Sequence, residues 1–141
     1  MKISHLLLSL LLTALPALAI ERGLTITAPA GVKPGENIHV VVTANTAATD
    51  GEQIGFFQVE YSSDGGKSWI PVYAEKVGRS HTRAIDFRAG AAGSPAMVRA
   101  RMAYRGGKSG DVDFAGKPLD WGGSWTKWAT PPAKSVTIEV K

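Results

Sequence analysis

Hydrophobic and polar residues alternate with a period of two in a series of short segments, and clusters of glycine and proline separate these segments. A period of two is typical of strands that bury one face. After residue 19, no ten-residue stretch has the spacing of an amphipathic helix. The pattern therefore predicts a domain built of strands and turns.

The alternation predicts seven strands, over residues 24–27, 38–44, 57–61, 69–74, 81–87, 96–104 and 135–140. In the sixth strand we expect Val98 and Ala100 to face the core, and Arg99 and Arg101 to face away from it. Seven short strands of this kind are typical of a single immunoglobulin-like antiparallel β-sandwich. The chain has no cysteine, so the inter-sheet disulfide of antibody domains is expected to be missing, as it is in fibronectin type III domains.

The first 19 residues have the features of a secretory signal peptide. Lys2 gives a positive start, residues 6–15 are mostly apolar, and Ala17-Leu18-Ala19 matches a small-x-small cleavage site. The apolar stretch is shorter than the roughly 20 residues that span a bilayer. We expect cleavage near Ala19, and an exported domain over residues 20–141 that is periplasmic or secreted and has no stable membrane insertion.

Charge is unevenly distributed along the chain. Residues 20–75 contain 3 basic and 7 acidic side chains, whereas residues 76–141 contain 12 basic and 5 acidic ones. The formal net charge of the whole chain is only +4. This modest charge, together with the export signal, argues against nucleic acid as a partner.

Residues 62–69, Ser-Ser-Asp-Gly-Gly-Lys-Ser-Trp, match the Asp-box pattern S-x-D-x-G-x-(T/S)-W. We expect Asp64 to accept hydrogen bonds from turn amides and Trp69 to pack under the hairpin. Gly65 and Gly66 allow positive φ in the turn. Sialidase-type propellers repeat this motif, whereas this chain contains it once, so these four residues are interpreted as structural.

The hairpin over residues 58–69 also resembles the V-E-V-S-x-D-G-G-x-x-W hairpin in the immunoglobulin-like C-terminal domain of sulfite-oxidase-type molybdenum enzymes. The resemblance specifies a hairpin rather than an activity. The chain has no cysteine to ligate molybdenum and no room for a molybdopterin domain. What the resemblance implies is an accessory subunit of a periplasmic redox or sulfur-oxidising system.

A long loop, residues 106–132, separates the last two predicted strands, and loops of this length are functional or disordered. Its aromatic content argues against disorder, because it contains three of the four tryptophans, Trp121, Trp125 and Trp128. Exposed indoles stack on sugar rings or anchor protein interfaces. The alternative is that they cover one end or an edge of the sandwich as a satellite core.

Three arginines, Arg99, Arg101 and Arg105, are expected on one face of the sixth strand, and Arg83 of the fifth strand is expected to join them. If the third and sixth strands pair, Glu60 lies opposite one of these arginines. Such a face forms a ladder of weak salt bridges, or it binds an anion or an acidic partner.

No catalytic residue, cofactor or metal is predicted, because no nucleophile with a base and an orienting group is recognisable. Asp111 and Asp113 offer oxygen ligands of the kind that Ca²⁺ prefers, but they lack the spacing of a calcium loop, which favours a solvated acidic loop. His39 and His81 lie far apart and have no metal-binding spacing.

The sequence therefore predicts an exported, non-catalytic interaction module. In this hypothesis, the loop tryptophans and the arginine face bind a protein partner. A carbohydrate-binding module that uses the same tryptophans is the alternative.

Overall fold

The computed structural model describes residues 22–125 and 134–141, without the side chains of residues 73–76, 124 and 125. The predicted signal peptide and Trp128 lie outside the described residues. The elements in chain order are β1 (Arg22–Thr27), β2 (Gly31–Val32), β3 (Asn37–Thr46), β4 (Gln53–Ser62), β5 (Ile70–Gly78), β6 (Ser80–Arg88), β7 (Ala96–Arg105), β8 (Val112–Asp113), η1 (Trp121–Trp125, one turn of π-helix) and β9 (Lys134–Val140).

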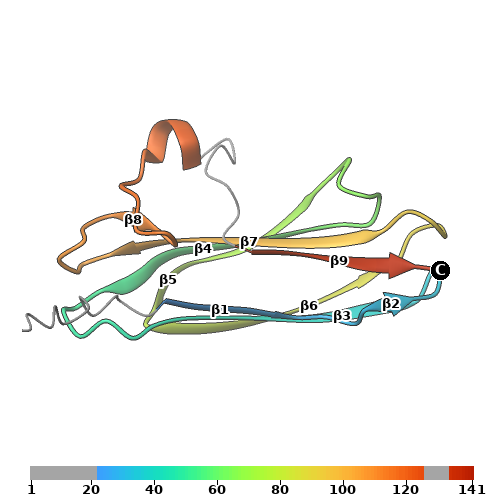
Figure 1. Cartoon of the computed structure of the whole chain (residues 1–141), viewed down its shortest axis with the longest axis horizontal. Helices are drawn as coiled ribbons and strands as arrows, with labels where there is room; N and C mark the ends of the chain where they lie inside the picture. Colours follow the sequence, from blue (N-terminus) through green and yellow to red (C-terminus); the bar gives the residue numbers. More distant parts are fainter. Residues whose placement is uncertain (1–21, 126–133) are drawn as a thin grey trace, which may run out of the picture.

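The strands form two layers (Figure 1). One sheet has the order β1-β3-β6, and the larger sheet has the order β2-β9-β7-β4-β5, with β8 added to β7. Neighbouring strands run antiparallel, except for the short parallel pair of β2 and β9. The predicted immunoglobulin-like β-sandwich is confirmed, and each of the seven predicted strands is present.

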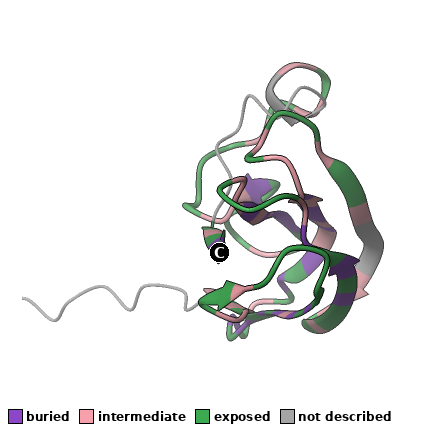
Figure 2. Cartoon of the chain, turned by 90° about the vertical axis from the view of Figure 1, so that its right-hand side faces the viewer, coloured by how far each residue is buried: buried purple, intermediate pink, exposed green. Residues whose placement is uncertain are grey.

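The core lies between the two sheets and is made of the inward-facing residues of both. Ile38, Val40 and Val98 are completely buried. The rings of Tyr61 and Phe87 stack across the gap, with their centroids 4.3 Å apart. Figure 2 views the sandwich from one end, where buried positions lie along the strands and exposed positions lie both on the strands and in the loops. Close packing of apolar side chains, without a disulfide, holds the layers together.

The described part of the segment predicted as one long loop, residues 106–125 of 106–132, contains two short elements. β8 pairs with the end of β7, and its Val112 is almost completely buried. η1 stands on the outer side of the layer that contains β4 and β7, away from the smaller sheet (Figure 1). Part of this segment is therefore an extension of the large sheet.

Arg83 does not lie beside Arg99, contrary to the prediction. The chain crosses from one sheet to the other between β5 and β6, so β6 belongs to the small sheet. Arg83 pairs with Val42, whose side chain faces the core, and is nevertheless exposed because β6 is an edge strand. An inward-facing charge on an edge strand disfavours pairing with another chain.

Candidate functional site

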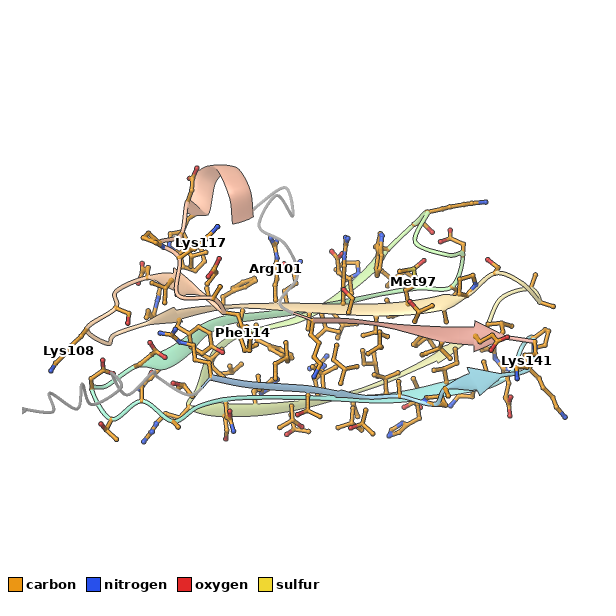
Figure 3. The ribbon with its side chains drawn as sticks, viewed as in Figure 1. Met97, Arg101, Lys108, Phe114, Lys117 and Lys141 are labelled. Atoms are coloured by element: carbon orange, nitrogen blue, oxygen red, sulfur yellow. The ribbon has the colours of Figure 1, made fainter. Side chains whose placement is uncertain are left out.

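The outer face of the large sheet carries the candidate residues. Successive side chains of β7 point to opposite faces of the sheet. Met97 and Arg101 stand on the side of this layer that faces away from the small sheet (Figure 3). We use the name arginine strip for Arg99, Arg101 and Arg105 together with the side chains that they contact.

Arg99 is held between a carboxylate and an indole. Its Nε and Nη2 donate to Oε2 of Glu60 over 2.9 and 2.6 Å, and the two residues are direct cross-strand partners. The predicted pairing of Glu60 with an arginine is confirmed. The guanidinium carbon also lies 3.9 Å from the ring centroid of Trp69, close enough for a cation–π contact.

Arg101 is not a surface residue, although it faces away from the core as predicted. Only 3% of it is exposed, and its Nε donates to Oε1 of Gln58 over 2.8 Å. Burial lowers the pKa of Arg101 to about 10, with a raising effect of Glu60 and a further lowering effect of Arg99. The side chain therefore stays charged at neutral pH, but a partner cannot contact it directly in this conformation.

Arg105 is exposed, and its guanidinium carbon lies 5.8 Å from the ring centroid of Trp121. Trp121 is half-buried, and its Nε1 donates to Oδ2 of Asp111 over 3.3 Å. Trp125 ends η1, but its side chain and the whole of Trp128 lie outside the described residues. Among the loop tryptophans whose side chains are described, Trp121 lies on the arginine strip.

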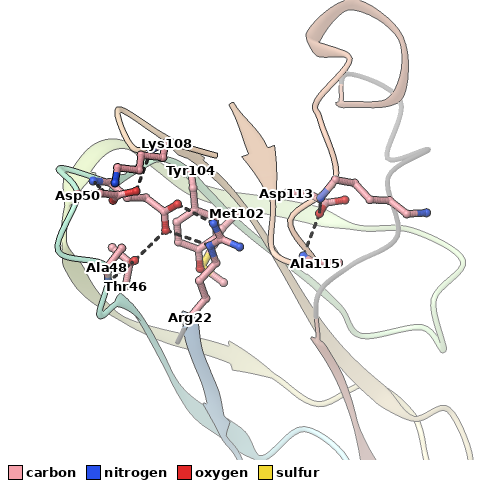
Figure 4. A network of polar contacts seen from close by, with 11 residues as sticks. Arg22, Thr46, Ala48, Asp50, Met102, Tyr104, Lys108, Asp113 and Ala115 are labelled. Atoms are coloured by element: carbon pink, nitrogen blue, oxygen red, sulfur yellow. Dashed lines mark hydrogen bonds and ion pairs between the residues drawn. The ribbon is translucent and has the colours of Figure 1, made fainter. Parts of the chain in front are cut away.

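The aspartates of this loop serve as local hydrogen-bond acceptors. Oδ1 of Asp113 accepts the backbone N–H groups of Ala115 and Lys117, the first of which is visible in Figure 4. Oδ1 of Asp120 accepts the N–H groups at the start of η1. Within residues 22–125 and 134–141, no group of three or more histidines and carboxylates is placed to hold a metal ion.

The Asp-box forms a closed turn between β4 and β5. Oδ1 of Asp64 accepts the backbone N–H of Ser68 over 2.9 Å and the hydroxyl of Ser62 over 2.7 Å. The hydroxyl of Ser68, together with these two bonds, holds the pKa of Asp64 well below its ordinary value. The indole of Trp69 donates to the carbonyl of Gly66 over 3.1 Å. The turn thereby positions Trp69 beneath Arg99.

A buried polar cluster, which the sequence analysis missed, lies at one end of the sandwich (Figure 4). Arg22 donates two hydrogen bonds to Glu52, and Thr46 donates a third, over 2.8 Å. The guanidinium of Arg22 also lies 4.9 Å from the ring centroid of Tyr104. Extending the alternation of β1 and β4 by one step beyond Leu24 and Ile54 would have placed both charges on the inner face.

His39 and Asp86 form an exposed pair on the outer face of the small sheet, with 2.9 Å between Nδ1 and Oδ1. Asn37 donates to the same carboxylate oxygen. Among the side chains that the structure describes, no hydroxyl hydrogen-bonds to this imidazole. The pair therefore has an orienting group but no nucleophile, and the geometry does not define a catalytic site.

The fold and its outer face define an immunoglobulin-like β-sandwich domain with a strip of guanidinium–indole contacts on the larger sheet. No protein-family model matches the chain, and no curated protein matches it. Among the described residues, none of the helices is long and apolar enough to cross a membrane.

Two proteins are among the solved structures to which the chain is similar. One is a protein described as ApaA from Bordetella pertussis, which is 10% identical, covers 86% of this chain and 94% of its own, and has a TM-score of 0.48. The other is a β-glucosidase from Listeria innocua, which is 17% identical and has a TM-score of 0.33, with 67% of this chain matching 15% of that one. At these scores, function has to be argued from the site itself.

Proposed function

We propose that the protein is an exported, non-catalytic binding module that contacts a protein partner through the arginine strip. The observation that carries the proposal is the contact of Arg99 with both Trp69 and Glu60 on an outer sheet face. Tryptophan and arginine are enriched among the residues that dominate the energy of protein interfaces. Ordered side chains of this kind lose little conformational freedom on binding.

The outer face and the β6 edge of the small sheet are less suited to a partner. The outer face of the small sheet has a row of three exposed threonines, Thr25, Thr43 and Thr82, across its three strands. This row offers neither a large apolar side chain nor a charge, and the carboxylate of Asp86 on the same face is already engaged by His39 and Asn37. The inward-facing Arg83 protects the β6 edge from strand addition. These features favour the arginine strip as the docking face.

Sugar binding by the tryptophans is the alternative function. A sugar-binding platform needs an open aromatic face. A guanidinium lies over one face of Trp69 and over one face of Trp121, which leaves each ring at most one face for a sugar. The contacts therefore favour a protein partner.

Site-specific photo-crosslinking in the cell envelope of the native host tests the proposal. A photoreactive amino acid is placed at Ser135, an exposed residue that pairs with Arg99, and in a matched control at Thr43 on the outer face of the small sheet. We expect a discrete adduct from position 135 and none from position 43. Equal crosslinking at both positions, or none at 135, would overturn the proposal. Binding to a glycan array that Trp121→Ala abolishes would instead support the sugar-binding alternative.

A further inference from the structure

Arg105 differs from the other two arginines of the strip in what its guanidinium meets. Arg99 is paired with Glu60, and Arg101 is buried against Gln58. Arg105 is exposed, and no carboxylate of the described part of the chain lies within ion-pair distance of it. Within the described residues, it is therefore the guanidinium of the strip that is accessible and has no carboxylate within ion-pair distance.

The stem of Arg105 lies directly on the backbone of Gly55. A Cβ atom at position 55 would lie 2.8 Å from Cγ, Cδ and Nε of Arg105, which is closer than such atoms pack. The register of β4 shifts at this residue against both β5 and β7. This shift is a β-bulge, an irregularity that changes the direction of neighbouring side chains.

Trp121 also contacts the guanidinium of Arg105. The ring lies within cation–π range of Arg105, and its N–H is fixed on the carboxylate of Asp111. Arg105 therefore has two supports, the bare backbone of Gly55 and an indole that is itself hydrogen-bonded. A guanidinium held in this way is ordered before any ligand arrives.

We propose that Arg105 anchors this face to a carboxylate on a short acidic segment of the partner protein, with Gly55 as the positioning residue. The inference rests on the proposed partner-binding function. The planar fork of a guanidinium matches both oxygens of a carboxylate. Glu60 is engaged by Arg99 and nearly buried, so the charge that the strip itself presents to solvent is positive.

The charges around Arg105 favour a short acidic segment over a broad acidic surface as the binding partner. Asp111, which accepts the indole N–H of Trp121, is exposed and adds one negative charge near Arg105. Lys108 and Lys117 add exposed positive charge on the turns that follow β7. A broad acidic surface would be repelled by Asp111, whereas a short segment that places one carboxylate on Arg105 would not.

Peptide binding to the full chain measures this preference. The probes are a short fluorescein-labelled peptide of consecutive glutamates and the matching glutamine peptide. Fluorescence anisotropy measures the binding of each peptide. We expect the glutamate peptide to bind about tenfold more tightly at low ionic strength, and the difference to shrink in high salt because the contact is exposed. Equal binding of the two peptides would overturn the inference.

Two variants test the geometry rather than the charge. Arg105→Lys keeps the charge but removes the fork, and Gly55→Ala keeps every charge but displaces the stem of Arg105. We expect each to weaken glutamate-peptide binding about threefold or more, because a single well-placed charged hydrogen bond contributes about this much or more. Arg83→Lys, a matched change of an exposed arginine on the other sheet, should leave binding unchanged.

Each outcome separates this inference from the proposed function. Wild-type affinity in Arg105→Lys, or the same loss in Arg83→Lys, would overturn the assignment of Arg105. Circular dichroism establishes whether Gly55→Ala is folded, and Arg105→Lys decides the question if it is not. A partner crosslinked at position 135 together with indifference to glutamate would overturn the acidic anchor alone. Absence of that crosslink would overturn the proposed function.

Discussion

Arg22, the first residue of β1, donates hydrogen bonds from Nε and Nη2 to the two carboxylate oxygens of Glu52, over 3.0 and 2.6 Å. The side chain of Glu52 is completely buried, and that of Arg22 is 9% exposed. The hydrogen bonds to Glu52 raise the pKa of Arg22. The pair fastens the beginning of the N-terminal strand to the loop between β3 and β4.

Glu52→Gln removes the charge that balances Arg22 and leaves a guanidinium uncompensated inside the fold. We expect the free energy of unfolding to fall by about 3 kcal/mol, the lower end of the range for breaking a buried ion pair, because the amide keeps one acceptor. Denaturant titration at neutral pH measures the change. Glu36→Gln, a change of an exposed glutamate, serves as the control and should be almost neutral. An unchanged midpoint in Glu52→Gln would show that the pair contributes little.

The double variant Arg22→Met with Glu52→Leu distinguishes the net contribution of the pair from the penalty of an unpaired charge. Apolar replacements of similar size often restore stability where a buried ion pair is removed entirely. We therefore expect the double variant to be more stable than Glu52→Gln, although Thr46 loses its acceptor. A double variant that is less stable than Glu52→Gln would contradict this view of the cluster.

The contact between Arg99 and Trp69 is expected to contribute measurably to the order of the outer face. Arg99→Lys keeps the positive charge but loses both the planar stacking and the fork toward Glu60. A double-mutant cycle with Trp69→Phe should give a coupling free energy of about 0.5–2 kcal/mol. A cycle between Arg83, on the small sheet, and Trp69, in the turn that leads into β5 of the large sheet, is the control. Coupling no larger than in the control would mean that the stacking is incidental.

The strands were predictable because each of them buries one face and exposes the other. In β7, Val98 and Ala100 are fully buried, and Arg99 lies on the opposite face, as the alternation requires. The burial of Arg101 was not predictable. The two-residue period of a strand determines the face on which a side chain lies. Whether other residues cover that face depends on contacts from segments distant in sequence.

The paired charges at positions 22 and 52 illustrate the other limit of sequence reasoning. Both continue the inward-facing series of their strands, but a charged residue at the end of a strand is usually solvated. Only the pairing of β1 with β3 and the approach of the β3–β4 loop bring Arg22 and Glu52 together. The Gly55 bulge is similar, because its effect on Arg105 depends on the register between β4 and β7.

The hydrogen-bonded turn at Asp64 should make the free energy of unfolding depend on pH in the acid range. The pKa of Asp64 is held below its ordinary value of 3.8 in the folded chain, so its stabilising effect is complete above that value. Below it, the unfolded chain binds a proton that the folded chain does not, and stability falls with pH. We expect Asp64→Asn to be less stable than the wild type at neutral pH and the difference to shrink as the pH falls below about 4. Denaturant midpoints at both pH values measure this.

A difference between Asp64→Asn and the wild type that stays constant down to the acid limit would exclude the charged form of Asp64 as the stabilising species. Asp86 provides a comparison on the small sheet. Hydrogen bonds from His39 and Asn37 also lower the pKa of its carboxyl, but all three side chains are exposed. We therefore expect Asp86→Asn to change the acid sensitivity less than Asp64→Asn does.

His81 should produce a second pH dependence, in the range where histidines titrate. Its ring meets Phe57 edge-on, with centroids 5.1 Å apart, and its Nε2 is buried without a hydrogen-bond partner in the described part of the chain. Burial lowers the pKa of His81 below 6.5, and Arg83 lowers it further. Well above pH 6.5 the ring is neutral in both the folded and the unfolded chain, and its effect on stability is constant.

As the pH falls below 6.5, the unfolded chain gains a proton at position 81 before the folded chain does, so stability must decrease. His81→Phe removes this proton and keeps an aromatic ring against Phe57, and we expect its melting temperature to vary less between pH 7 and pH 5.5 than that of the wild type. His39→Gln, at the exposed histidine of the small sheet, controls for histidine titration in general. An NMR titration of the His81 ring should give a midpoint below 6.5. A midpoint at or above 6.5 would mean that partial burial and the charge of Arg83 do not disfavour the protonated ring.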